Sequence, residues 1–413
     1  MSEVSGERLE PLLPPLARGS AAPSASLPFL FWIHSDPHLD WIHLLQCDPD
    51  WDSRMESQNA AEIWLLRQLM THPNRTDSWQ KARVVLLPIL PLASLRVGRC
   101  FGTDHPQRLR DAVGAMLSHP AYGRRHGHDH LLLFNHWDAW GAFGDRWSHT
   151  HSALSNVSFG WHETADAAWG MANHRHVGKC QLVLPYVEPR ACAELPEAMI
   201  AADGSFGSRT TSIFFAGAAA DFDTPDGCPN VATHSVRVRR SLFALAGEIP
   251  GAKLRQIPHN MRHCNGSILC EERTKRKAAD EMRRARYCAI AAGDTPSTGR
   301  LYDAIACGCV PLILVDDLEL PFPSTAAVPL DAFGVRVKEK TFLADPQSAI
   351  RQVVQQPAAS WRHAQRRVLL ARRRLVYRAP GSIVASLALR EAWATCLRQD
   401  ASRARPPSSV AKC

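Results

Sequence analysis

The stretch from 285 to 322 limits the fold of this 413-residue chain more than any other. An apolar run over 287–292 ends at Gly293-Asp294, and the next four residues supply turn chemistry and a helix N-cap. A short amphipathic helix follows, and 310–315 is a second apolar run with the length of a buried parallel strand. This order predicts a β-loop-α-β unit. Its free N–H groups and the positive end of the helix dipole favour a phosphate above the loop.

The same passage resembles the signature block of the exostosin family of glycosyltransferases. In that block an apolar strand, Gly-Asp and a Ser/Thr-rich turn precede Arg-Leu-x-Asp-Ala, Gly-Cys-x-Pro, an acidic pair and Leu-Pro-Phe. Weaker matches extend the resemblance over residues 29 to 380. The residues that match the block in order are Gly293-Asp294, Arg300-Leu301, Asp303-Ala304, Gly308-Cys309, Pro311, Asp316-Asp317 and Leu320-Pro321-Phe322.

Strands and helices alternate in two blocks along the chain. This pattern predicts an α/β protein with two doubly wound, Rossmann-like domains that face each other across a cleft. The resemblance implies the same architecture, which is called GT-B. We place the first, acceptor-side domain at 28–205, the second, nucleotide-sugar-binding domain at 206–345, and closing helices at 346–400. The terminal segments 1–27 and 401–413 have the composition of disordered chain.

The second domain is expected to bind a nucleoside diphosphate sugar, because ligands of such sheets lie beyond the carboxyl ends of the strands. Arg300 can clamp the diphosphate, and an ion pair with Asp303 is its structural alternative. Acidic residues after the next strand can accept hydrogen bonds from ribose or sugar hydroxyls. Since helix dipole and Arg can neutralise the diphosphate, we expect no cofactor and no metal. The predicted donor-binding residues are Gly293, Asp294, Ser297, Thr298, Arg300, Asp303, Arg239, Asp317 and Glu319.

The resemblance also implies an inverting reaction, in which a base from the first domain deprotonates the acceptor hydroxyl. The turn 127–130 leads into an apolar strand, and its Gly127, Asp129 and His130 coincide with the family's pattern. We therefore predict Asp129 and His130 as the catalytic candidates. The structural alternative is that Asp129 caps the turn and His130 bonds to buried backbone.

Two other functions remain open. Histidines crowd the first domain, and Asp129, Asp138 or Glu163 can complete a zinc site, so a His-rich metal-dependent hydrolase is the alternative enzyme. The chain can also be a catalytically inactive glycan-binding or partner subunit, although its donor signature argues against that. The histidines concerned are His126, His128, His130, His136, His149, His151, His162, His174 and His176.

The formal net charge of +8 fits an anionic partner such as a nucleotide sugar or an acidic glycan. The basic runs lack the interleaved aromatic residues of RNA-binding modules, so we do not expect nucleic acid. The predicted partners are a nucleotide-sugar donor and a glycan or glycoprotein acceptor. The resemblance adds assembly with a related glycosyltransferase.

Cysteines and sequons point to a secretory compartment. The twelve cysteines are not expected to form a dense framework, although Cys264 and Cys270 can close a small loop. Sequons begin at Asn74, Asn156 and Asn265. The resemblance implies the Golgi lumen and an N-terminal membrane anchor. Because 1–27 resembles neither a signal peptide nor an anchor, we expect a true N-terminus upstream and membrane association through it.

Overall fold

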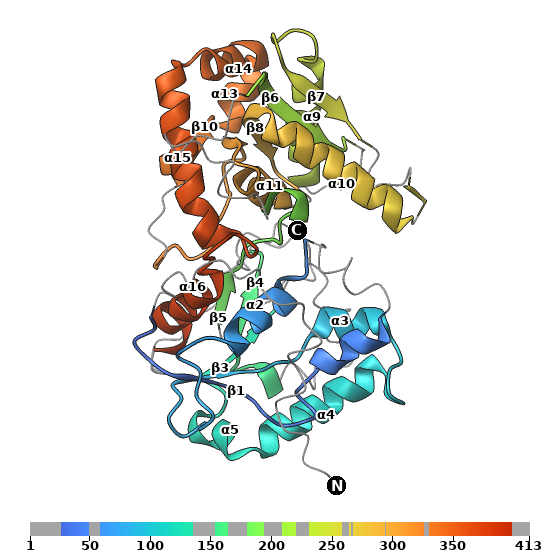
Figure 1. The fold of residues 1–413 in the computed structure, drawn as a ribbon, viewed down its shortest axis with the longest axis vertical. Helices are drawn as coiled ribbons and strands as arrows, with labels where there is room; N and C mark the ends of the chain where they lie inside the picture. Colours follow the sequence, from blue (N-terminus) through green and yellow to red (C-terminus); the bar gives the residue numbers. More distant parts are fainter. Residues whose placement is uncertain are drawn as a thin grey trace.

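The computed structural model shows two lobes, each built around a five-stranded sheet (Figure 1). All neighbouring strands in both sheets are parallel, and helices flank the sheets. The predicted fold class is therefore confirmed. The structure describes residues 26–48, 58–134, 153–163, 180–193, 209–219, 231–257, 264–265, 267–293, 295–325 and 330–398.

The first sheet keeps its strands in chain order. They are β1 (Phe31–Ile33), β2 (Val84–Leu86), β3 (His130–Leu133), β4 (Ser158–Trp161) and β5 (Cys180–Val183). Nearly all their side chains are buried, which explains their continuous apolar runs. The helical elements of this lobe are η3 (Ile42–Cys47, 3₁₀), α2 (Ala61–Met70), α3 (Pro91–Val97), α4 (His105–Ser118) and α5 (Pro120–Arg125).

The second sheet has the strand order β10-β9-β8-β6-β7. This order reverses between β6 and β8, and ligands of doubly wound sheets bind beyond the carboxyl ends of the strands at such a point. The strands are β6 (Thr211–Gly217), β7 (Lys253–Gln256), β8 (Ala285–Ala291), β9 (Val310–Leu314) and β10 (Val335–Arg336). The helices are α9 (Val231–Ala244), α10 (Ile268–Arg283), α11 (Gly299–Ala306), α12 (Leu330–Phe333), α13 (Glu339–Ala344), α14 (Pro346–Val354) and α15 (Ala358–Leu375).

The chain crosses twice between the lobes. After β5 it enters the second lobe through α8 (Arg190–Ala193), and after α15 it returns to α16 (Val384–Glu391) and the π-helical turn η6 (Ala392–Leu397) beside the first sheet (Figure 1). The buried carboxylate of Glu188 joins the crossings, because it accepts hydrogen bonds from the backbone N–H groups of Tyr377 and Arg378 at 3.1 and 2.9 Å. The closing helices are thus shared between the lobes. The predicted boundary after residue 205 lies outside the described residues.

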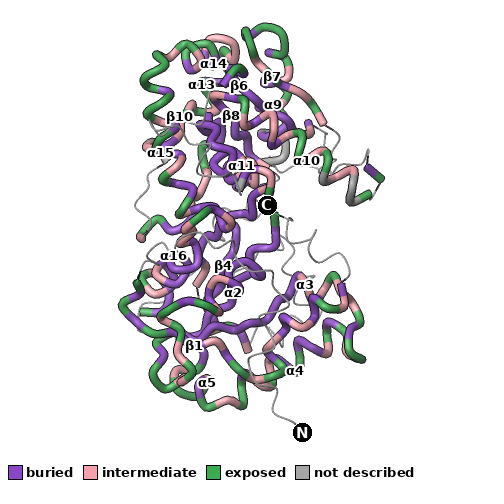
Figure 2. Tube along the Cα trace, viewed as in Figure 1, coloured by how far each residue is buried: buried purple, intermediate pink, exposed green. Residues whose placement is uncertain are grey.

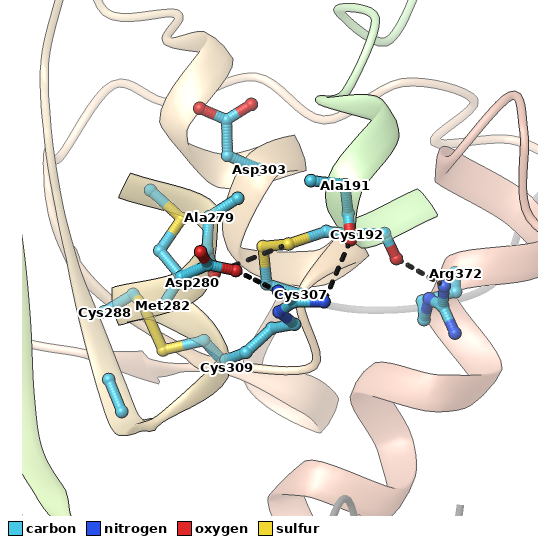
Figure 3. The surroundings of a disulfide bond; sticks show 12 residues. Ala191, Cys192, Ala279, Asp280, Met282, Cys288, Asp303, Cys307, Cys309 and Arg372 are labelled. Carbon is cyan, nitrogen blue, oxygen red and sulfur yellow. Dashed lines mark hydrogen bonds and ion pairs between the residues drawn. A yellow bond between two sulfur atoms is a disulfide. The ribbon is translucent and has the colours of Figure 1, made fainter. Parts of the chain in front are cut away.

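Within the described residues, five disulfides pair ten of the protein's twelve cysteines, so the expectation that the cysteines form no dense framework was wrong. The predicted small loop between Cys264 and Cys270 is confirmed. Cys192–Cys307 fastens α8 to the end of α11, and Arg372 donates to the carbonyl of Cys192 at 3.1 Å (Figure 3). The other bonds are Cys47–Cys100, Cys180–Cys396 and Cys288–Cys309. Bonds of this number are typical of an oxidising compartment.

Buried residues run through the centre of both lobes and continue between them near β4 and α11 (Figure 2). On one face of the first sheet, Trp32 and Val85 pack against Ala121 of α5. The opposite face belongs to the large core, in which Phe31, Val84 and the apolar residues of α2 take part. Within the described residues, no helix combines the length and apolar composition needed to cross a bilayer.

Candidate functional site

The loop between β8 and α11 is shaped by a glycine and a cap. A Cβ atom on Gly293 would lie 2.8 Å from the carbonyl oxygen of Ser297, so the tight return of the loop leaves no room for a side chain. Thr298 is the N-cap of α11, and its hydroxyl accepts a hydrogen bond from the N–H of Arg300 at 3.3 Å. These predicted donor residues come together at the carboxyl edge of the sheet. Asp294 lies outside the described residues.

Arg239 lies at the point where the strand order reverses. Its guanidinium donates to the carbonyl oxygens of Ala218, just after β6, and Ala292, just after β8, at 2.8 and 2.6 Å. The hydroxyl of Ser235, also on α9, donates to the same carbonyl of Ala292 at 2.7 Å. The helix therefore positions the beginning of the loop, and it brings a positive charge to the edge where phosphate is expected.

Arg300 lies in the first turn of α11, beside the loop. Its Nη1 is 3.7 Å from Oδ2 of Asp303, which is the contact of the structural alternative. Burial raises the pKa of Asp303 to about 6, and the charge of Arg300 opposes this rise. The side chain of Arg300 is 30% exposed. Because its ion pair with Asp303 is long and its side chain is partly exposed, the guanidinium of Arg300 can turn toward an anion at the loop.

The acidic residues after β9 differ in their surroundings. Asp316 is tied to Glu339 at the start of α13, because each accepts a hydrogen bond from the other's backbone N–H at 3.2 and 3.1 Å. Asp317 is exposed. Glu319 is half-buried, and its negative charge acts on Glu163 of the first lobe. Of the two predicted residues, the structure brings Glu319 toward the interface between the lobes.

Glu163 lies two residues after the end of β4, and its carboxylate reaches the loop from the first lobe. Its Oε1 accepts hydrogen bonds from the backbone N–H of Ser297, at 3.0 Å, and from the hydroxyl of Thr295. Glu163 is 5% exposed. Burial raises the pKa of this carboxyl, and the hydrogen bonds from Ser297 and Thr295 only partly oppose the rise. The sequence suggested Glu163 only as a zinc ligand, so its place opposite the loop 293–299, named the donor loop below for its predicted role, was missed.

Two more first-lobe residues touch the loop or its helix. The hydroxyls of Tyr186 and Ser297 lie 3.0 Å apart and are hydrogen-bonded. A Cβ on Gly299 would lie 2.8 Å from Oε1 of Gln58, so the start of α11 packs closely on that amide. Tyr186 lies shortly after the end of β5, a position typical of site residues, but the sequence does not indicate which loop it faces.

The sequence matches the Exostosin GT47 domain over residues 29–353, which is most of the chain. The chain belongs to the exostosin GT47 family of glycosyltransferases. A probable beta-1,4-xylosyltransferase, IRX10 of Arabidopsis thaliana, is 25% identical over 305 residues, covering 72% of this chain and 65% of the relative. A probable glucuronosyltransferase, Os03g0107900 of Oryza sativa subsp. japonica, is 24% identical over 273 residues, covering 64% and 57%. The chain thus spans less than two thirds of these relatives' length.

Solved structures resemble this GT47 chain more distantly. An alpha,alpha-trehalose-phosphate synthase (UDP-forming) from Burkholderia vietnamiensis is 12% identical, with a TM-score of 0.35 and coverage of 83% of this chain and 84% of that one. A likeness at this level carries no argument about the site. Two parallel five-stranded sheets, each in its own lobe and flanked by helices, are the arrangement of the GT-B architecture.

The predicted catalytic pair lies elsewhere in the GT47 chain. Asp129 and His130 are fully buried at the amino end of β3. Asp129 accepts hydrogen bonds from Arg124 at 2.6 Å and from Nδ1 of His130 at 2.8 Å. Because the donor loop faces the carboxyl edge of the first sheet, this placement does not bring the pair to the loop. A turn that enters a strand lies at the opposite edge from the ligand-binding one. The side chains of Asp129 and His130 bond to Arg124 and to each other, so neither the turn cap nor the backbone bond of the structural alternative is seen.

The histidines do not form a metal centre in the part of the chain that the structure describes. There, no group of three or more His, Cys, Asp or Glu residues is arranged to hold a metal ion. Several members of the predicted cluster lie outside the described residues, namely His136, Asp138, His149, His151, His174 and His176.

Proposed function

We propose that this chain is an inverting glycosyltransferase that moves a sugar from a nucleoside diphosphate sugar, UDP-linked in the first instance, to a hydroxyl of a glycan or glycoprotein. The loop 293–299 carries the proposal. It combines a glycine-dependent turn, a capped helix start and nearby Arg239 and Arg300 at the reversal of the second sheet. Relatives named for xylosyl and glucuronosyl transfer support a pentose or a uronic acid as the first donor sugars to test.

Each part of this loop has a defined task in such a reaction. The N–H groups at the start of α11 and the two guanidinium groups stabilise the charge that grows on the leaving diphosphate. The neighbouring first lobe presents the acceptor hydroxyl from the opposite side, as direct displacement requires. Glu319 can accept hydrogen bonds from donor hydroxyls. The charge stabilisation needed at the leaving group is therefore available from the protein itself.

The donor proposal is tested by nucleotide binding and by transfer. A panel of UDP-sugars is offered to purified protein, and nucleotide release is measured with and without glycan acceptors. We expect Arg300→Ala to weaken UDP binding about tenfold or more, because a charge-assisted hydrogen bond contributes roughly 1.5–3 kcal/mol. Lys277→Ala, which removes an exposed charge on α10, is the matched control. Equal UDP affinity in folded Arg300→Ala would remove Arg300 from the site, and binding without turnover would favour an inactive subunit.

We also propose a Golgi-lumenal location, supported by the five disulfides and the family. The structure distinguishes the sequons by how accessible their asparagine amides are, and this difference allows a test of the location. The amide of Asn74 is occupied by the carbonyls of Leu27 and Phe29 at 3.1 and 3.3 Å, whereas Asn265 is exposed. Mass spectrometry of the protein from secreting cells should find a glycan at Asn265 and none at Asn74. An unglycosylated cytosolic protein with reduced cysteines would contradict the location.

A further inference from the structure

The contact between Glu163 and the donor loop joins groups that a bound donor would separate. Ser297 and Thr295 both donate to the same oxygen, Oε1 of Glu163. In a loop of this type, N–H and hydroxyl groups are the donors that a phosphate oxygen uses. A carboxylate oxygen is an anionic acceptor of similar size. In this structure Glu163 therefore holds the place of a phosphate oxygen.

We propose that Glu163 is the catalytic base that deprotonates the acceptor hydroxyl, and that donor binding releases it from Ser297 and Thr295. This proposal rests on the proposed glycosyltransferase function. The donor's diphosphate takes over the loop donors, and the freed carboxylate moves to the side of the sugar opposite the diphosphate, where the acceptor hydroxyl arrives. Without donor, the base stays bound to the loop, so donor binds before acceptor is activated.

The chemical step balances with the groups named. The Glu163 carboxylate takes the proton of the acceptor hydroxyl, and the acceptor oxygen forms a bond to the anomeric carbon of the sugar. The bond between that carbon and the diphosphate oxygen breaks, and its electron pair leaves with the nucleoside diphosphate. Protonated Glu163 then returns its proton to solvent after the product departs. A base on the face opposite the leaving group gives inversion.

The surroundings of Glu163 raise the affinity of its carboxylate for a proton. Burial raises its pKa, and the negative charge of Glu319 acts in the same direction. Other titratable groups nearby are Tyr302, whose pKa the charge of Glu163 raises, Tyr186, which bonds to Ser297, and His162, whose ring lies 5.5 Å from that of Tyr186. A carboxylate with a raised proton affinity accepts a hydroxyl proton more readily than an ordinary one.

Other buried carboxylates of the described chain have different tasks. Glu62 accepts the backbone N–H groups of Leu92 and Ala93 at the start of α3. Glu188 binds the return crossing, as described above. Both bind backbone that belongs to the framework of the fold. Glu391 of α16 accepts hydrogen bonds from the backbone N–H of Ser324 and the hydroxyl of Thr325, which lie outside the donor loop. Among these four buried glutamates, Glu163 alone bonds to the donor loop, and it does so from the opposing lobe.

The test separates turnover from nucleotide binding in Glu163→Gln. This variant keeps the shape but loses the charge and the ability to take a proton. We expect kcat to fall about a hundredfold or more, because a general base usually contributes at least this factor to the rate. UDP affinity should rise about threefold or more, because a neutral amide competes less well for the loop donors. Glu281→Gln, which alters an ion pair between α10 and Arg255 of β7, is the control and should leave both values unchanged.

The outcomes are distinct. If the wild-type protein neither binds UDP nor transfers sugar, the proposed function fails before Glu163 is examined. If it does both and Glu163→Gln keeps kcat within about threefold, the base is another group. Loss of both UDP affinity and turnover at an unchanged melting temperature would make Glu163 a donor-positioning residue and overturn the proposal. If Glu163→Gln does not fold, Glu163→Asp replaces it. Its kcat should fall with the acid limb of the pH profile displaced, and an unmoved limb with normal kcat would refute the proposal.

Discussion

Two buried carboxylates at opposite edges of the first sheet show how position separates structural from catalytic candidates. Asp129, at the amino end of β3, is bonded to the side chains of Arg124 and His130. Glu163, after the carboxyl end of β4, is bonded to a hydroxyl and an amide of the other lobe. Burial alone raises the pKa of Asp129, but the hydrogen bonds and charges of His130 and Arg124 outweigh it and lower the pKa overall. Burial dominates at Glu163 and raises the pKa.

The difference lies in whether the partners can be exchanged. The partners of Asp129 carry or can carry positive charge, lie within one lobe and leave the carboxylate no freedom. The partners of Glu163 are neutral, belong to the other lobe and match what a phosphate needs. A charge held by permanent opposite charges stabilises the fold, whereas one held by a ligand's own donors can be displaced by that ligand.

The largest effect is expected from Asp129→Ala. Without Asp129, the fully buried His130 loses the partner of its Nδ1. Arg124, in contrast, is 26% exposed and keeps its bonds to the carbonyls of Trp79 and Ala82. Breaking a fully buried ion pair typically costs about 3–5 kcal/mol, which is the upper limit here. We expect a fall of up to this size in the free energy of unfolding, measured by urea titration, with kcat of the folded fraction within about threefold of wild type. A variant that keeps its stability and loses turnover would restore Asp129 as a catalytic residue and break the comparison.

The pH dependence of stability checks the same assignment. The lowered pKa of Asp129 means that its stabilising contribution is complete above the ordinary Asp value of 3.8. This contribution is lost as pH falls through the folded-state pKa. The unfolding free energy of wild type should therefore decline on acidification, and Asp129→Asn should lack that part of the decline.

The second lobe was more predictable from sequence than the first. Its signature spans a contiguous strand, loop and helix, so local patterns place Gly293, Ser297, Thr298 and Arg300 together. The acceptor side instead depends on which loop of one lobe meets which loop of the other. Nothing local in the sequence tells that Glu163 meets Ser297, 134 positions away. Asp129 and His130 do match the family's pattern, but they lie where the chain enters β3. Local sequence does not show at which edge of the first sheet the site lies.

Disulfide removal is expected to have the second-largest effect. If the contacts between the lobes at Glu163 exchange easily, other links must hold the two lobes in their relative position. One such link is the disulfide Cys192–Cys307, which joins the chain crossing at α8 to α11 and whose cysteines are 115 positions apart in the sequence. Replacing both cysteines by serine should lower the free energy of unfolding by about 2–4 kcal/mol. Calorimetry measures the change, and nucleotide affinity reports on the relative position of the lobes. A loss of stability under about 0.5 kcal/mol would show that noncovalent contacts hold the lobes.

Gly293→Ala tests the donor side with a smaller change. The added Cβ would meet the carbonyl of Ser297 at 2.8 Å, so the loop must open. We expect UDP affinity to fall about tenfold, or roughly 1.4 kcal/mol. Gly114→Ala is the matched control, because a Cβ there meets nothing within 4 Å on α4. It should leave affinity unchanged and raise stability slightly, since Ala favours helix. Equal UDP affinity in both variants would show that the loop at Gly293 is not part of the donor site.

The smallest effect is expected for the hydrogen bond between Tyr186 and Ser297, which crosses the lobes next to Glu163. A double-mutant cycle of Tyr186→Phe and Ser297→Ala isolates this bond in the free energy of unfolding. A neutral hydrogen bond contributes about 0.5–1.5 kcal/mol net, and we expect a coupling energy at the lower end. Such a value fits an interface that must give up its bonds when the donor arrives. A coupling energy above about 2 kcal/mol would mean that this edge is held as firmly as the Asp129 cluster, and the contrast between exchangeable and permanent partners would then not hold.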